Sequence, residues 1–270
     1  MSDQDRKNMI QQAFDTVAQG YDHPSLSFFS QTAKGMMECL ELQGHHQLLD
    51  VCTGTGVVAL AAAELLNEGK VTGIDLSNGM LQQAKNKASD KKLDNTEFLQ
   101  MDLDKLEFAS ETFDVACSSF GLFFLEDMAS ALKNISNVVK RGGKIAISTF
   151  TGEAFLPMSD MFLACYESYG KEIPTLSWKR LATRELIEEQ FAEVGITNVE
   201  VHHLPLGYQM TDAQMWWDVV WNAGYRGLLN QLTEDQQTEF KEKHMAEISE
   251  LIGDEGIWFN TEVLIAVAVK

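Results

Sequence analysis

The chain has 270 residues, of which 45% are hydrophobic, so it can bury one large core and lies near the upper size for a single core. Its 40 acidic residues against 21 lysines and arginines give a net charge of −19, which repels phosphate backbones and disfavours a nucleic-acid partner. No run of about 18 apolar residues occurs, and the N-terminal "MSDQDRKNMIQQ" lacks the apolar core of a secretion signal. We therefore expect a cytoplasmic protein with no membrane insertion.

The N-terminal half predicts an α/β core. Residues 3–45 contain two expected helices. From residue 47 to about 150, short apolar runs alternate with helical patterns, which is typical of βαβ units and a parallel sheet. Strands are expected at 47–52, 70–76, 96–102, 113–120 and 143–150, with helices at 57–67, 78–89 and 127–140 between them. Glycines 142 and 143 are expected to end the last of these helices.

The C-terminal half completes the sheet and adds insertions. An amphipathic helix ends at Gly195, and two further strands follow at 197–206 and 261–270. The residues between these two strands are predicted to be helical, because Thr-x-x-Gln capping boxes begin at Thr211 and Thr233. These patterns indicate a doubly wound layout of seven strands. The expected fold class is a doubly wound, seven-stranded, Rossmann-like α/β sheet, mostly parallel with an antiparallel last strand, with helical insertions that form a lid.

A single domain is expected over residues 1–270, because no linker, repeat or low-complexity tract interrupts it. Its expected parts are an N-terminal helical cover (1–45), a cofactor-binding core (46–150), two substrate-side insertions (151–182 and 208–260) and the end of the core (183–207 and 261–270). Oligomeric state cannot be predicted from this sequence. The cysteines Cys39, Cys52, Cys117 and Cys165 lack C-x-x-C pairing and suggest neither a disulfide nor a metal site.

A glycine loop follows the first expected strand, in "LLDVCTGTGVVAL" (48–60). Gly54, Gly56 and Ala59 match the G-x-G-x-x-G/A pattern, and Asp75 follows 21 residues after Gly54. Taken alone, this pattern indicates a dinucleotide site, so an NAD-dependent oxidoreductase is one reading. A strand-to-helix turn without a ligand is a less favoured reading.

Three carboxylates distinguish between the possible cofactors. Asp50 ends the first strand, where it would oppose a pyrophosphate but favour an ammonium group. Asp75 can accept both hydroxyls of a ribose, and Asp102, at the end of the third strand, can accept a hydrogen bond from the adenine amine. Three carboxylates around one nucleoside suit a cofactor with net positive character, such as a sulfonium with an α-amino group.

Several segments in order resemble the class I S-adenosylmethionine-dependent methyltransferases, in particular the small-molecule group of ubiquinone and menaquinone biosynthesis. They are "FDTVAQGYD" (14–22), "LLDVCTGTG" (48–56), "VTGIDLSNGMLQQA" (71–84), "MDLDKLEF" (101–108), "FDVACSSFGLFFLED" (113–127) and "LKNISNVVKRGGKIAIS" (132–148). One departure is Cys52, which stands where the family pattern D-x-G-x-G-x-G has its first glycine. The resemblance implies methyl transfer from S-adenosylmethionine to a small molecule, with no metal.

The resemblance also implies roles for residues of the cofactor site. The loop at Gly54 and Gly56 would pass under the methionine part, with Asp50 reaching its ammonium and Tyr21 closing over it. Backbone near Cys117 and Ser118 would hold the methionine end. The full expected set is Tyr21, Asp50, Cys52, Thr53, Gly54, Gly56, Asp75, Leu76, Met80, Asp102, Leu103, Cys117 and Ser118, with Leu76 and Met80 lining the adenine.

Residues for the acceptor and for proton transfer are less well marked. His23, beside the "GYD" segment, is the one histidine proposed as a base, whereas His244 lies on an apolar helical stripe typical of a core histidine. The tryptophan-rich stretch "MWWDVVWNAGYRGLL" predicts a helix buried against the core or one that covers a substrate pocket. The expected substrate residues are Phe120, Trp217, Trp221 and Arg226, although an internal acid such as Glu153 or Asp218 is the favoured partner of Arg226.

The predicted reaction is therefore an in-line transfer of a methyl group to a nucleophilic N, O, S or C atom of a small metabolite. Two alternatives stay open from the sequence. An NAD-dependent oxidoreductase would keep the glycine loop but leave Asp50 and Asp102 without a role. A non-catalytic S-adenosylmethionine-binding module would need a blocked pocket over the methyl group, which the aromatic insertion disfavours.

Overall fold

A seven-stranded sheet forms the centre of the protein, in a computed structural model that describes residues 3–173 and 175–270. The strand order is β3-β2-β1-β4-β5-β9-β6, and β9 runs antiparallel to both of its neighbours. The strands are β1 (Gln47–Val51), β2 (Lys70–Asp75), β3 (Thr96–Gln100), β4 (Phe113–Ser119), β5 (Val139–Phe150), β6 (Val199–Leu204) and β9 (Val263–Val269). This arrangement confirms the predicted Rossmann-like sheet with its antiparallel last strand.

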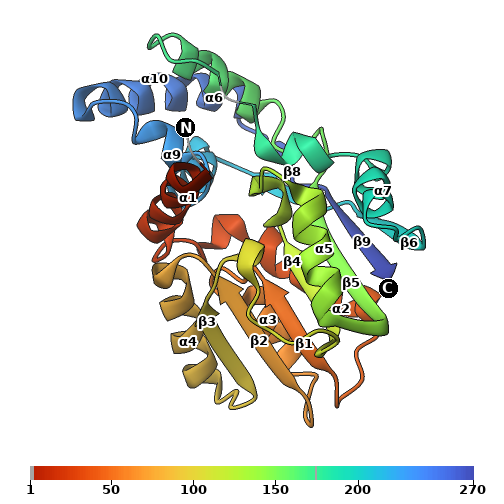
Figure 1. Ribbon diagram of the computed structural model, residues 1–270. Helices are drawn as coiled ribbons and strands as arrows, with labels where there is room; N and C mark the ends of the chain where they lie inside the picture. Colours follow the sequence, from red (N-terminus) through yellow and green to blue (C-terminus); the bar gives the residue numbers. More distant parts are fainter. Residues whose placement is uncertain (1–2, 174) are drawn as a thin grey trace.

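Helices cover both faces of the sheet and one of its ends. On one face lie α2 (Phe28–Leu40), α3 (Val57–Ala63) and α4 (Asn78–Lys91), and on the other lie α5 (Met128–Val138) and α7 (Arg184–Glu193). The remaining helices are α1 (Asp3–Val17), α6 (Met158–Glu167), α8 (Ala213–Asn222), α9 (Arg226–Leu229) and α10 (Glu234–Ile252). Figure 1 shows α1, α6, α9 and α10 above the end of the sheet at which the parallel strands finish. Ligands bind at this end of open α/β sheets.

Short 3₁₀ turns connect these elements near the same end of the sheet. They are η1 (Pro24–Leu26), η2 (Leu103–Lys105), η3 (Leu122–Phe124) and η4 (Ser177–Leu181). Among the residues 3–173 and 175–270, no helix is both long enough and apolar enough to span a bilayer.

The helix boundaries agree with the predicted ones at α10 and differ from them at α8, α5 and α3. Thr233 forms the predicted capping box with Gln236 at the start of α10. At α8 the N-cap is Asp212 rather than the predicted Thr211, since the Asp212 carboxylate accepts the backbone N–H of Met215. The helix predicted over 127–140 ends at Val138, where β5 begins, and the one predicted over 57–67 ends at Ala63.

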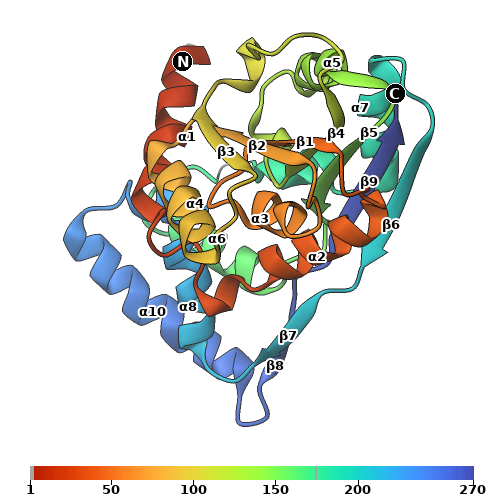
Figure 2. The same ribbon diagram turned by 90° about the horizontal axis from the view of Figure 1, so that it is seen from below.

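The insertion at 208–260 is not entirely helical, contrary to the prediction. Its two ends form a small antiparallel ribbon of β7 (Gly207–Met210) and β8 (Ile257–Asn260). Figure 2 shows this ribbon extending away from the main sheet. Each strand has only four residues, too few for a clear alternating pattern, and the two are far apart in the chain, so local periodicity could not identify them.

The insertions share the core of the sheet. Phe162 of α6, Trp216 of α8 and Phe240 of α10 are fully buried in the same hydrophobic cluster as the sheet residues. Separate domains each have their own hydrophobic core, whereas this cluster is continuous. The single-domain organisation and its internal boundaries stay a prediction, which this continuous core supports.

Candidate functional site

Two cavities meet where the parallel strands end. The strand-end cavity, as we call it, lies between the β1, β2 and β4 ends and α1. It is lined by Arg6, Lys7, Ile10, Gln11, Phe14, Tyr21, Phe29, Asp50, Cys52, Thr53, Gly54, Thr55, Val57, Val58, Asp75, Leu76, Ser77, Met80, Ser119, Phe120, Gly121, Phe124 and Leu125. Its neighbour, the aromatic cavity, has a volume of about 230 Å³. The two share a wall of Phe14, Tyr21, Phe29, Phe120 and Phe124.

The glycine loop leaves room for a ligand at Gly54. Gly54 has a φ of +54°, and a Cβ placed there would meet no atom within 4 Å, so the space above the loop is open. The Asp75 carboxylate accepts the backbone N–H of Gly54 and that of Ser77, each at 2.9 Å. Burial raises the pKa of Asp75, while these backbone hydrogen bonds oppose the rise. Asp75 therefore ties the loop to the end of β2 at the edge of the cavity.

Gly56, also expected under the cofactor, lies at the start of α3. It has a φ of +80°, but a Cβ there would approach the Ala84 Cβ at 2.9 Å. Gly56 therefore allows α3 to begin close against α4, and it does not line the cavity.

Asp50 is a buried carboxyl group at the end of β1, with 1% of its surface exposed. The Thr53 hydroxyl and the Ala59 backbone N–H donate to its Oδ2 at 2.6 and 3.1 Å. Burial raises the pKa of Asp50 to about 6, although these hydrogen bonds oppose the rise. An ammonium group in the adjoining cavity would stabilise the charged form of this carboxyl.

Cys52 stands at a backbone position that favours glycine, since its φ is +57°. It also lies against Gly121, where a Cβ would come within 2.5 Å of the Cys52 Cβ. Burial raises the pKa of the Cys52 thiol, so the group is a neutral wall rather than a nucleophile.

The left-handed backbone at Cys52 leads to a testable prediction. Cys52→Gly should keep the free energy of unfolding within about 1 kcal/mol of the wild type, because the lost side-chain packing is offset by relief of strain. Cys52→Val should be less stable than the glycine variant by about 2 kcal/mol, because β-branched residues are strained at positive φ. Urea unfolding checks both, and equal stabilities would contradict the backbone argument.

Of the residues expected to bind the cofactor, eight line the strand-end cavity. These are Tyr21, Asp50, Cys52, Thr53, Gly54, Asp75, Leu76 and Met80. The cavity lining does not include the other five, which are Gly56, Asp102, Leu103, Cys117 and Ser118. Cys117 and Ser118 are buried inside β4, and the next two residues, Ser119 and Phe120, face the cavity in their place.

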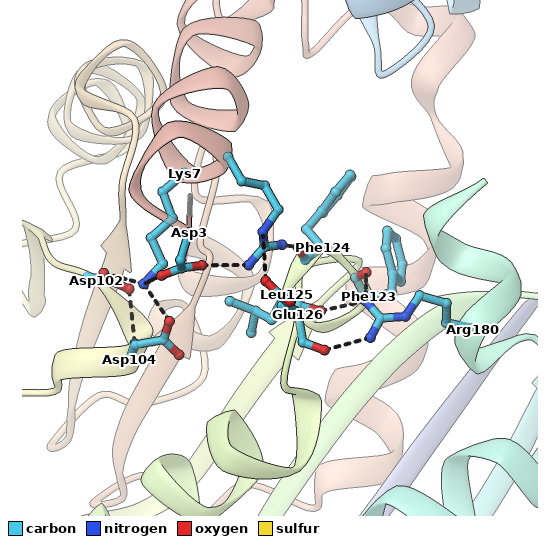
Figure 3. Close-up of polar contacts among 10 residues, drawn as sticks. Asp3, Lys7, Asp102, Asp104, Phe123, Phe124, Leu125, Glu126 and Arg180 are labelled. Carbon is cyan, nitrogen blue, oxygen red and sulfur yellow. Dashed lines mark hydrogen bonds and ion pairs between the residues drawn. The ribbon is translucent and has the colours of Figure 1, made fainter. Parts of the chain in front are cut away.

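Helix α1 forms one wall of the strand-end cavity, as part of the expected N-terminal cover, but no residue of this helix was predicted to line the site. Lys7, Ile10, Gln11 and Phe14 line the cavity, and their spacing of i, i+3, i+4 and i+7 puts them on one face of the helix. That periodicity was the available signal. Lys7 lies between three carboxylates, among them Asp102 (Figure 3).

The loop after β4 is held from two sides. Arg6 of α1 donates to the Phe124 carbonyl, and Arg180 of η4 donates to the carbonyls of Phe123, Leu125 and Glu126 (Figure 3). Phe123 and Phe124 line the aromatic cavity, so the two arginines position part of its wall.

The aromatic cavity has an uncharged lining. Phe120 stacks on Phe150 with ring centroids 4.3 Å apart, and Tyr21 stacks on Phe29 at 5.0 Å. The lining consists of Phe14, Tyr21, Phe28, Phe29, Phe120, Phe123, Phe124, Phe150, Phe155, Thr175, Leu176, Ser177, Trp178, Val219, Ala223, Gly224, Tyr225 and Leu228. Burial raises the pKa of both Tyr21 and Tyr225, so these phenols are neutral. Among the described residues, therefore, the cavity wall carries no charge at neutral pH.

Phe120 is the one expected substrate residue that faces the aromatic cavity. Trp217 and Trp221 line a surface depression elsewhere, because the opposite face of α8, with Val219 and Ala223, faces the cavity. Arg226 is also outside both cavities. Its guanidinium lies 3.1 Å from the centroid of the Trp221 ring and donates to the Asn230 amide oxygen, so the expected pairing with Glu153 or Asp218 is wrong.

His23 does not line either cavity. Its Nδ1 accepts the backbone N–H of Ser25 at the start of η1, and its Nε2 lies 3.8 Å from Asp218. The structure therefore gives it a capping function and does not bring it to the other expected site residues.

His244 is a fully buried core histidine. Its Nε2 accepts the Trp216 indole N–H at 2.8 Å, so the neutral ring carries its proton on Nδ1. Cys165 and Glu247 approach His244 closely enough for the three to hold a metal ion. However, a protonated Nδ1 has no lone pair to offer a metal, so this hydrogen bond disfavours a metal site.

The burial of neutral His244 predicts acid sensitivity. Burial lowers its pKa from 6.5 to about 4, so the unfolded chain binds more protons than the folded protein between these values. The stability from neutral His244 is thus present above pH 6.5 and is lost as pH falls toward 4. We expect His244→Gln, which can still accept the indole N–H, to reduce the slope of unfolding free energy against pH by up to about 1.4 kcal/mol per unit.

Urea unfolding at several pH values measures the slope. Exposed His45→Gln is the control, and a wild-type slope in His244→Gln would contradict the argument.

Comparison with known proteins agrees with this geometry. A family model described as the ubiE/COQ5 methyltransferase family matches residues 1–207. A demethylmenaquinone methyltransferase from Alkalihalophilus pseudofirmus is 29% identical over 217 residues, covering 73% of this chain and 92% of that protein. The aklanonic acid methyltransferase DauC from Streptomyces sp. (strain C5) is 30% identical over 150 residues, covering 55% of this chain and 68% of that protein.

Solved structures share the fold. The YcgJ protein from Bacillus subtilis aligns with a TM-score of 0.62 at 18% identity, covering 89% of this chain and 98% of that one. Phosphoethanolamine N-methyltransferase 2 from Haemonchus contortus, solved with S-adenosylhomocysteine, aligns with a TM-score of 0.55 at 19% identity, covering 89% of this chain and 52% of that one. With its family model matched over most of its length, the chain belongs to the ubiE/COQ5 methyltransferase family and is an S-adenosylmethionine-dependent methyltransferase.

Proposed function

We propose that S-adenosylmethionine occupies the strand-end cavity and that a small, apolar, uncharged methyl acceptor occupies the aromatic cavity. The observation that carries this proposal is that the two cavities are adjacent and have lining residues in common, among them Tyr21 and Phe120. A methyl group transferred in line must pass directly from one ligand to the other, so the two sites must be contiguous.

The residues of the strand-end cavity fit the cofactor. The open space above Gly54 would hold the methionine part, and the buried Asp50 carboxyl would pair with its ammonium. Asp75 would accept hydrogen bonds from the ribose, and Leu76 and Met80 would pack against the adenine. When bound, the cofactor supplies an electrophilic methyl group on a sulfonium.

The lining of the aromatic cavity indicates the chemistry of the acceptor. Burying a charged acceptor there would cost free energy that no charged side chain of the lining offsets. The neutral lining also offers no strong base, so we propose an acceptor whose N, O, S or C atom is nucleophilic without one. Two relatives are named for organic acceptors, demethylmenaquinone and aklanonic acid, which supports a small-molecule acceptor.

We also propose that the protein is cytoplasmic and that it binds no nucleic acid. All four cysteines are free thiols, which agrees with the expected cytoplasmic location. The net charge of −19 supports the prediction that no nucleic acid is bound.

The test is a methyl-transfer assay with pairs of acceptors, in which one member of each pair has an added anionic substituent. The protein would be mixed with S-adenosylmethionine and either 1-naphthylamine or 4-amino-1-naphthalenesulfonate, and likewise aniline or 4-aminobenzoate, and the formation of S-adenosylhomocysteine measured. The nitrogen of each arylamine is neutral at neutral pH and is nucleophilic without a base. We expect transfer to uncharged members of these pairs and little to the charged ones. Transfer confined to charged acceptors would contradict the proposed use of the aromatic cavity.

A further inference from the structure

Helix α1 is attached to the core at the ends of three strands. Near the β2 end, the Asp15 carboxylate accepts the Ser77 hydroxyl and the Gly79 backbone N–H. Near the β4 end, Arg6 donates to the Phe124 carbonyl. Lys7 makes the third attachment at the β3 end. Since the same helix lines the strand-end cavity, its position decides how open that cavity is.

Lys7 is an unusual member of this set because it is a buried cation. Only 7% of its surface is exposed. Its Nζ lies 2.8 Å from the Asp102 carboxylate and also pairs with Asp104 and Asp3, as Figure 3 shows. Burial by itself lowers the pKa of Lys7, but the three carboxylates outweigh it and raise the pKa. The lysine is therefore charged, and it joins α1 to the segment after β3.

Asp102 is held in place by the same arrangement. Its Oδ1 accepts the Asp104 backbone N–H at 3.0 Å, and its Oδ2 accepts from Lys7. Lys7 lines the strand-end cavity, whereas Asp102 does not. The lysine thus lies between the cavity and the carboxylate that the family resemblance assigns to the adenine amine.

We propose that Lys7 is a cofactor-positioning residue, whose ion pairs with Asp102 and Asp104 hold α1 closed over the adenosine end of the bound cofactor. This rests on the proposed placement of the cofactor in the strand-end cavity. Lys7 acts through the helix and through Asp102 and takes no part in the transfer. Its loss therefore speeds release of the cofactor, because Asp3 of α1 then faces Asp102 and Asp104 of the segment after β3 with no cation between them.

The test measures binding of S-adenosylhomocysteine to the full chain by calorimetry and its release by stopped-flow fluorescence. We expect Lys7→Met to weaken affinity about tenfold, mostly through a faster release, and Lys7→Arg to restore much of it. Asp104→Asn, at a residue outside the cavity lining, should likewise weaken affinity and speed release. Lys105→Met is the matched control, since Lys105 is an exposed lysine of η2, and it should behave as wild type.

A second readout separates closure from general stability. S-adenosylhomocysteine should slow hydrogen exchange of residues 3–17 in the wild type and in Lys105→Met, but much less in Lys7→Met. If wild-type protein does not bind S-adenosylhomocysteine at all, the proposed function fails. If wild type binds it and Lys7→Met and Asp104→Asn release it as slowly as Lys105→Met, the role of Lys7 is overturned. Should Lys7→Met not fold, Asp104→Asn alone decides.

Discussion

Asp75→Ala is expected to weaken binding of S-adenosylmethionine and S-adenosylhomocysteine by about a hundredfold, roughly 3 kcal/mol. The change removes the carboxylate that we propose accepts the two ribose hydroxyls, and hydrogen bonds to charged groups contribute more than neutral ones. It also frees the backbone N–H groups of Gly54 and Ser77, which Asp75 now holds at 2.9 Å, so the glycine loop loses its tie to β2. Calorimetry with both ligands measures the effect.

The control for this prediction is an acid beside the neighbouring strand β3. Asp94→Ala removes an exposed carboxylate before β3 and should leave cofactor affinity within twofold of wild type. Thermal unfolding without ligand shows whether Asp75→Ala is still folded at the temperature of the titration. Equal affinities of Asp75→Ala and wild type would place the cofactor elsewhere.

Ala223→Phe should block the acceptor without affecting the cofactor. Ala223 lines the aromatic cavity but not the strand-end cavity, and a phenyl group there would occupy much of its volume of about 230 Å³. We expect methyl transfer to fall at least a hundredfold, on the order of 3 kcal/mol in transition-state free energy, while the affinity for S-adenosylhomocysteine changes less than threefold. Steady-state kinetics with an acceptor found in the arylamine assay measures the loss.

The matched control is Ala192→Phe, on the exposed face of α7, which should be active. Adding volume to a packed wall often costs about 1 to 3 kcal/mol of stability, so the unfolding temperature of both variants must be compared. Full activity in a folded Ala223→Phe would show that the acceptor binds outside the aromatic cavity.

The sheet could be predicted because its signals are local. Each core strand is a short apolar run between turn residues, and the connecting helices have their own periodicity, so the seven strands of the main sheet follow from the chain. Asp50 and Asp75 could be located for the same reason, since the end of a parallel strand in this fold marks the ligand-binding edge.

Other features depend on contacts between distant segments. Both the Trp217 face and the Val219 face of α8 are apolar, so the sequence does not show which of them faces the aromatic cavity. The segments that pack on the helix decide this. The pairing of Lys7 with Asp102 joins residues 95 positions apart, and no local pattern predicts it. The stripe on α1 that contains Ile10 and Phe14 was visible in the sequence but did not indicate which cavity it would face.

The most direct test of the two-cavity account is a crystal structure of the protein with S-adenosylhomocysteine. We expect the ribose hydroxyls of the ligand within hydrogen-bond distance of the Asp75 carboxylate and its amino group beside Asp50. Its sulfur should face Tyr21 and Phe120, which line both cavities. A ligand whose sulfur points away from the aromatic cavity, or one bound outside the strand-end cavity, would contradict it.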